Sequence, residues 1–137
     1  MRRVLRVAFL VFISVILVAC EGGYVTSGSR ESSQLGSRGG WLEKSIRSAN
    51  GSVTQSLEVG VSGLRLETYV TLEVEEGLFT IELLDEERNP TLSLQASPGN
   101  PASGRGYMVS RAGDANYRVI AEEAKGVHYR LEFEFVD

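Results

Sequence analysis

Residues 127–135 read VHYRLEFEF, and their alternation decides the fold class. Apolar side chains occupy every second position, and polar or charged side chains occupy the positions between them. The first set is Val127, Tyr129, Leu131, Phe133 and Phe135, and the second is His128, Arg130, Glu132 and Glu134. Successive side chains of a β-strand point to opposite faces. This period of two therefore predicts a strand with one face on a core and the other in water.

The same period recurs upstream, from about residue 52. Six further runs show it, namely residues 53–59, 64–75, 78–83, 91–96, 107–110 and 117–122. We expect a hairpin at Glu76-Gly77, a polar turn at 85–90 and a Pro/Gly loop at 97–104. One sheet cannot cover so many apolar faces, so a second sheet must pack on the first. The prediction is an all-β, jelly-roll-like sandwich of about seven mainly antiparallel strands.

The N-terminal stretch MRRVLRVAFLVFISVILVAC, residues 1–20, predicts export. A basic start precedes the apolar run 7–18, which has the length of a signal-peptide core and is shorter than the roughly 20 residues of a membrane-spanning helix. The run ends in Leu17-Val18-Ala19-Cys20, which resembles the lipobox of bacterial lipoproteins. That resemblance implies a lipid on Cys20 and cleavage after Ala19. An uncleaved signal anchor and an ordinary secretory peptide are the alternatives.

Cys20 is the only cysteine of the chain, so the domain that follows contains no internal disulfide. Its sulfur is then free to carry acyl chains such as palmitate, and two or more chains give stable anchoring where one does not. We expect a protein held by this lipid on the extracytoplasmic side of a bacterial membrane, at the cell surface or in the periplasm.

Three parts of the chain follow from this interpretation: a signal peptide at 1–19 that is removed, lipidated Cys20 with a tether to residue 40, and one sandwich domain over 41–137. Residues 21–40 are rich in Gly and Ser. Such a segment buries too little apolar surface to offset its ordering entropy, and as a coil it spans about 25 Å. Residues 41–49, WLEKSIRSA, have helical apolar spacing but little length, so a helix there stays an open alternative.

Charge excludes one class of partner. The whole chain has a formal net charge of −4. Without the three arginines of the signal peptide, Lys+Arg falls from 14 to 11 against 18 Asp+Glu, which gives −7. An acidic body is repelled by nucleic acid and by anionic headgroups. We expect no nucleic-acid binding, and membrane contact through the lipid on Cys20 alone.

No motif names a reaction. One histidine and one cysteine cannot form a zinc site, and the acids of the turn 85–90 lack EF-hand spacing. We therefore predict no catalytic residue, metal ligand or cofactor. His128 is interpreted as an exposed strand residue, with a pH-sensitive contact or the base of a serine triad as alternatives. The candidate surface contacts are Trp41, Tyr69, Arg105 and Arg111, each of which also fits ordinary packing or cross-strand pairing.

Residues 52–137 show a second resemblance. The succession TLEVEEGLFTIELLDEERNP (71–90), NYRVIAEEA (116–124) and YRLEFEF (129–135) is similar to the prepeptidase-type C-terminal domains of secreted bacterial proteins. The resemblance implies a sandwich that binds polymers or packs beside a partner and catalyses nothing itself. In this chain we expect a lipid anchor where such modules follow an enzyme.

Together these observations predict a lipid-anchored, non-catalytic module that recognises a protein or an envelope polymer. The first alternative is an accessory subunit that tethers an exported enzyme or secretion machine. The second is a small hydrolase, which a deep pocket lined by convergent acids, or by His128 with a serine, would indicate.

Overall fold

The computed structural model describes residues 23–136, so the predicted signal peptide, the cleavage site after Ala19 and the lipidation site Cys20 lie outside the described residues. Within that range no helix is long and apolar enough to cross a membrane. The range contains eight strands: β1 Val25–Ser27, β2 Arg30–Leu35, β3 Gly39–Glu58, β4 Arg65–Glu73, β5 Glu76–Leu84, β6 Pro90–Ala96, β7 Ala102–Val109 and β8 Asp114–Val136.

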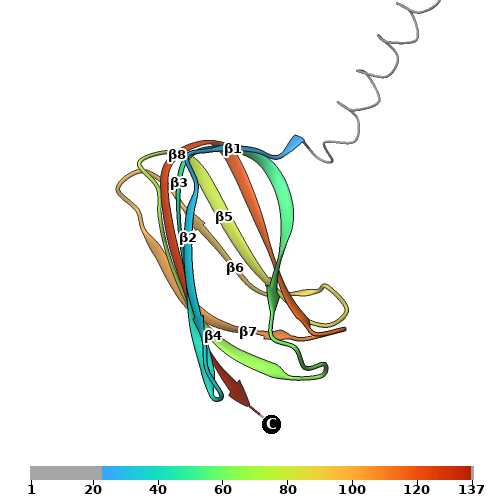
Figure 1. The fold of residues 1–137 in the computed structure, drawn as a ribbon. Coiled ribbons are helices and arrows are strands. Elements are labelled where there is room, and N and C mark those ends of the chain that lie inside the picture. Colours follow the sequence, from blue (N-terminus) through green and yellow to red (C-terminus); the bar gives the residue numbers. More distant parts are fainter. Residues whose placement is uncertain (1–22, 137) are drawn as a thin grey trace, which may run out of the picture.

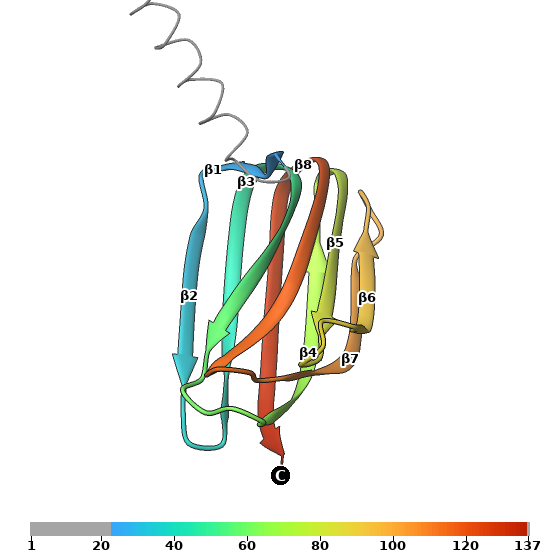
Figure 2. The same ribbon diagram turned by 90° about the vertical axis from the view of Figure 1, so that its right-hand side faces the viewer.

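All strand pairs are antiparallel, and the single hydrogen-bonded sheet folds over on itself into two layers (Figures 1 and 2). The first layer has the order β2, β3, β8, β4, β7, and it uses the first half of β3 and the second half of β8. The second layer uses the other halves of β3 and β8, followed by β5 and β6. The predicted all-β sandwich is therefore confirmed.

The two layers meet at a corner where three segments bend together. The β3–β8 register shifts between Ala49 and Gly51, opposite residues 121–124 of β8. The segment from β4 to β5 bends beside it, because β4 pairs with the second half of β8 and β5 pairs with the first half. Gly77 has a φ of +76°, and a Cβ there would collide with the carbonyl oxygens of Glu122 and Glu123. Only glycine allows this close approach of two backbones.

This corner corrects two sequence predictions. Glu76-Gly77 is not the turn of a hairpin, because β4 and β5 do not pair with each other and lie in different layers. The predicted strands 117–122 and 127–135 are one bent strand, β8, which forms the seam of both layers. Two alternating runs separated by a few polar residues can be two strands of a hairpin or two halves of one bent strand. The sequence pattern is the same in both cases.

The predicted tether over residues 20–40 is wrong where the structure describes it. β1 pairs with residues 48–50 of β3, and β2 pairs with residues 40–45, although β1 and β2 are exposed on both faces. Ladder hydrogen bonds to β3 order this segment without burial. The strands therefore begin at residue 25 and not near 52, and residues 41–49, left open as a helix, belong to β3. The Pro/Gly loop is also shorter than expected, since β7 begins at Ala102.

The core lies between the layers and contains the apolar sets that alternation predicted. Leu66, Val70, Ile81 and Leu131 have no solvent exposure, and the neighbouring positions on each strand face water. Strand β7 differs, because Met108 and not Tyr107 is the fully buried residue. Strands β6 and β7 are the edge strands of the two layers and do not pair with each other. The Thr91 hydroxyl of β6 donates to the Tyr107 carbonyl of β7 and accepts from the Tyr107 N–H, which joins the two edges.

Two tyrosine hydroxyls meet in the middle of this core. The Oη atoms of Tyr117 and Tyr129 are 3.0 Å apart, and the Tyr129 ring stacks on Phe79 with centroids 5.8 Å apart. Burial raises the pKa of both tyrosines above the ordinary value. One hydroxyl donates to the other, and burial keeps both tyrosines neutral within an otherwise apolar core.

Alkaline pH is expected to unfold the protein through this pair. An unfolded tyrosine ionises near pH 10, whereas folded Tyr117 and Tyr129 stay protonated. The folded state then binds more protons, so stability is unchanged below about pH 10 and falls above it by up to about 1.4 kcal/mol per pH unit for each tyrosine. Urea unfolding between pH 8 and 11.5 measures this slope. The double variant Tyr117→Phe/Tyr129→Phe should have a shallower slope, and an equal slope would contradict the assignment.

Candidate functional site

The outward face of the first layer carries an open groove of about 390 Å³. Strand register places one residue from each of five strands in a row across this face, in the order Gln34, Trp41, Glu132, Tyr69 and Arg105. Four members of the row line the groove together with Arg130. We call Trp41, Tyr69, Arg105, Arg130 and Glu132 the aromatic groove.

Arg130 fixes the tryptophan side of the aromatic groove. Its Nε donates to Glu132 Oε1 at 2.7 Å, and its Nη1 donates to Glu43 Oε2 at 2.9 Å. The guanidinium carbon lies 4.7 Å from the centroid of the Trp41 ring. The hydrogen bond to Glu132 raises the pKa of Arg130 above the ordinary value of an arginine. A permanent cation held by two carboxylates thus packs against the indole, which orders the ring before any ligand arrives.

Tyr69 forms the other side of the aromatic groove. Its side chain is 36% exposed, and the Arg105 guanidinium carbon lies 5.3 Å from its ring centroid. Only strand β8 separates Tyr69 from Trp41, so the two backbones are about 10 Å apart. The carboxylate of Glu132 lies between them in the same row. The result is two aromatic rings on one face, flanked by planar charged groups that donate and accept hydrogen bonds.

Of the four predicted surface contacts, the structure brings Trp41, Tyr69 and Arg105 together. Arg111 is separate, because it lies in the turn between β7 and β8, where its backbone pairs with Asp114. Trp41 lies on the outward face of β3, and its buried neighbour Leu42 points inward.

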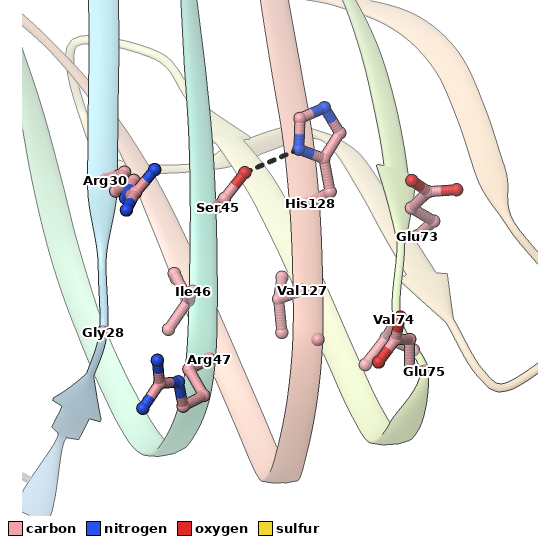
Figure 3. Close-up of a pocket in the computed structure, with 11 residues that line it drawn as sticks. Gly28, Arg30, Ser45, Ile46, Arg47, Glu73, Val74, Glu75, Val127 and His128 are labelled. Carbon is pink, nitrogen blue, oxygen red and sulfur yellow. Dashed lines mark hydrogen bonds between the residues drawn. The ribbon is translucent and has the colours of Figure 1, made fainter.

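A second pocket of about 580 Å³ lies farther along the same face (Figure 3). We call its polar lining the charged pocket, and it consists of Arg30, Ser45, Arg47, Glu73, Glu75 and His128. The arginines lie on the β2 and β3 side, the glutamates on the β4 side, and Ser45 and His128 between them. A shallow depression of about 320 Å³ connects the two sites, since it shares Tyr69 with the aromatic groove and Glu73 and His128 with the charged pocket.

His128 has a polar contact at each ring nitrogen, a hydrogen bond with Ser45 and a charge-pair contact with Glu43. Its Nδ1 lies 2.8 Å from Ser45 Oγ, and its Nε2 lies 3.2 Å from Glu43 Oε1. With the proton on Nε2, Nδ1 accepts from the serine hydroxyl and the Nε2–H faces the Glu43 carboxylate. Serine, histidine and glutamate in this order are the components of a hydrolase triad.

The backbone around Ser45 differs from that around the nucleophile of a serine hydrolase. We call Ser45, His128 and Glu43 the relay. Ser45 lies in the middle of β3, paired on one side with Arg30 and on the other with His128. Ladder pairing on both sides occupies the backbone N–H groups that an oxyanion hole needs. Glu43 also accepts from Arg130, so its charge is shared between the imidazole and a guanidinium.

The acidic turn 85–90 closes on itself. Asp85 Oδ1 accepts from the backbone N–H groups of Glu87 and Asn89, at 2.9 and 2.8 Å. This carboxylate therefore caps a turn. Across residues 23–136, no three His, Cys, Asp or Glu side chains gather in a way that could hold a metal ion.

Much of this face was not predicted from the sequence. Arg30 and Arg47 fell in segments interpreted as tether or helix, and Arg130 and Glu132 were assigned only as outward residues of a strand. Alternation was the signal that could have found the last two, because it places them on the face opposite the core. Their pairing with Trp41 and Tyr69 depends on register between distant strands, which alternation does not specify.

No protein-family model matches the chain, and no curated protein sequence matches it. Solved structures with a related arrangement include the CBM22-1 xylan-binding domain of Paenibacillus barcinonensis Xyn10C, at 16% identity and a TM-score of 0.39, covering 82% of this chain and 84% of that chain. The carbohydrate-binding module CBM6cm-2 of Cellvibrio mixtus lichenase 5A, in complex with cellotriose, has 12% identity and a TM-score of 0.39. The match covers 82% of this chain and 91% of that module. A Bacillus endospore appendage protein has 8% identity and a TM-score of 0.41, covering 82% and 95%. Carbohydrate-binding modules are thus among the structures that this chain is similar to.

Proposed function

We propose that this protein is a non-catalytic binding module that holds a glycan of the cell envelope in the aromatic groove and is itself anchored to a membrane through a lipid on Cys20. The observation that carries the proposal is the cross-strand row in which Trp41 and Tyr69 flank Glu132 on one exposed face.

The chemistry of the aromatic groove suits a sugar. A pyranose ring presents patches of C–H groups, which pack on aromatic faces, and a rim of hydroxyls, which hydrogen-bond to charged planar groups. Trp41 and Tyr69 supply the faces, and Arg105, Arg130 and Glu132 supply donors and acceptors. The contacts between Arg130, Trp41 and the two carboxylates preorganise the tryptophan side, which lowers the entropy cost of binding.

The shape of the aromatic groove favours a polymer. Sites for small molecules enclose most of the ligand, whereas this groove is open and continues into the depression and the charged pocket. A protein partner fits less well, because stable interfaces have an apolar centre. The large apolar side chains exposed within residues 23–136 are Val25, Leu35, Val61, Tyr69 and Val136, and of these only Tyr69 lines the groove.

The proposed anchor would keep the domain close to the bilayer. Strand β1 begins at Val25, so four residues separate it from Cys20. Fully extended, that stretch spans at most about 17 Å. The predicted 20-residue coil would have allowed about 25 Å. The module would therefore present its outward face to envelope polymer that lies close to the membrane surface.

Removing either aromatic ring is expected to weaken glycan binding strongly. Trp41→Ala and Tyr69→Ala each remove a central aromatic contact worth about 2 kcal/mol, which corresponds to about a thirtyfold increase in Kd. Affinity electrophoresis of the full-length protein in detergent, with glycan strands prepared from bacterial cell walls as the probe, measures this. Arg111→Ala is the control and should leave the Kd unchanged, since Arg111 is exposed and does not line the groove. Unchanged affinity in both aromatic variants would refute the proposal.

The relay of Ser45, His128 and Glu43 favours a hydrolase as the second candidate function. It predicts that Ser45 reacts with a fluorophosphonate probe and that Ser45→Ala abolishes the reaction. The binding proposal expects no labelling, because ladder pairing occupies the backbone donors around Ser45. Mass spectrometry of the probe-treated protein distinguishes the two functions.

A further inference from the structure

The charged pocket separates positive from negative side chains. Arg30 and Arg47 lie on one side, and Glu73 and Glu75 on the other (Figure 3). All four side chains are exposed, and none has an ion-pair partner among residues 23–136. By contrast, Arg130 and Glu132 in the neighbouring aromatic groove neutralise each other. The charged pocket is therefore complementary to a ligand that carries both a negative and a positive group.

Two glycines shape the charged pocket. A Cβ at Gly126 would collide with the carboxylate of Glu75, and a Cβ at Gly28 would lie 2.8 Å from the Cβ of Arg47. Gly126 also has a φ of +63°, which favours glycine. The missing side chains leave room for Glu75 and Arg47 to lie over the sheet, so that the opposite charges face one space.

The spacing of the segments that carry the charges suits a short peptide. Arg47 and Glu75 belong to segments separated by strand β8, so their backbones are about 10 Å apart. A single amino acid brings its amine and carboxylate much closer together than that, whereas an extended peptide of about three residues spans the distance. Between the charges, the Ser45 hydroxyl and the His128 ring are fixed and can meet peptide amide groups.

Ligands of one charge fit poorly. A phosphate-rich polymer would be repelled by Glu73 and Glu75 and by the net negative charge of the chain. A simple cation would be repelled by Arg30 and Arg47. The charged pocket is also continuous with the aromatic groove, with Tyr69 and His128 on the connecting depression. The rows of Trp41 and Ser45 are four residues apart along β3, or about 13 Å. One molecule of that length reaches both sites.

We infer that the envelope polymer is peptidoglycan, with its glycan in the aromatic groove and a peptide substituent in the charged pocket. This inference rests on the proposed function and adds the substrate class. A glycan that bears short peptides with free amino and carboxylate groups supplies both the sugar faces and the paired opposite charges that the two adjoining sites are built to contact.

The test compares two probes on the full-length protein in detergent: intact peptidoglycan sacculi, and the same sacculi after an amidase has removed the peptides. Wild type is expected to bind the intact sacculi about tenfold more tightly, because charge-assisted contacts are lost with the peptides. Arg47→Gln and Glu75→Gln should each lose this preference but still bind the stripped glycan. Trp41→Ala should weaken binding to both probes. Arg111→Gln and Glu86→Gln are matched controls on exposed charges outside the pocket.

The outcomes separate the two proposals. Equal binding of both probes by wild type would overturn the peptidoglycan inference and leave glycan binding in place. Binding of neither probe would overturn both. Tighter binding to poly(glycerol phosphate) than to intact sacculi would also overturn the inference, since Glu73 and Glu75 should repel that polymer. Melting curves of each variant show whether it is folded, and a variant that fails to fold is replaced by Arg30→Gln or Glu73→Gln, which remove a charge of the same sign from the charged pocket and should lose the preference.

Discussion

Leu131→Asp is expected to abolish folding. Leu131 has no solvent exposure and lies in the second half of β8, which pairs with both β3 and β4. An aspartate there would be an unpaired charge among apolar side chains, which costs several kcal/mol. The total stability of a domain is about 5–15 kcal/mol, so this single change uses most or all of it. Phe133→Asp, on the same face of β8 and 4% exposed, should act in the same way.

Far-ultraviolet circular dichroism and a thermal melt measure the loss of the Leu131→Asp fold. The matched control is Glu134→Ala on the same strand, because Glu134 is exposed and its removal should change stability by no more than about 0.5 kcal/mol. A Leu131→Asp protein with a wild-type spectrum and melting temperature would mean that the inward face of β8 is assigned wrongly.

Cys20→Ala is expected to release the protein from the membrane completely. If the lipobox acts as its resemblance implies, two or more acyl chains on Cys20 provide the anchorage, and each buried CH₂ contributes about 0.8 kcal/mol. Cys20 is the only cysteine, so no other thiol can take the lipid. The variant should lose all labelling by an alkyne-tagged palmitate and move from the detergent phase to the aqueous phase on cloud-point separation.

Glu21→Gln is the control for the anchor, because it changes the adjacent residue and leaves the thiol in place. The strands begin at Val25, so the purified Cys20→Ala protein should melt at the wild-type temperature. Unchanged partitioning of Cys20→Ala would refute the lipid anchor. That outcome leaves the glycan-binding proposal standing, since the aromatic groove lies wholly within residues 41–132.

Some parts of the fold could not be predicted from sequence for identifiable reasons. Strands β1 and β2 are exposed on both faces, so they carry no alternation, and only their hydrogen bonds to β3 make them strands. In the first half of β3, the buried residues are Leu42, Ile46 and Ala49. Their spacing resembles that of a helix, but it arises from a strand that runs into the bulge at the corner. The corner itself depends on Gly77 lying against Glu122 and Glu123, a contact between segments 45 residues apart.

Alternation along the chain is enough to predict which side chains of β4, β5 and β8 face the core. Burial of apolar surface is the main driving force of folding, and the period of a strand is two, so alternation identifies the buried face without knowledge of the partners. The outward residues are under no such local constraint. Register across β2, β3, β8, β4 and β7 decides that Trp41, Glu132 and Tyr69 share a row, and that Ser45 meets His128. Register follows from the packing of the whole sandwich and from its shared corner, so the candidate site is a property of the tertiary structure.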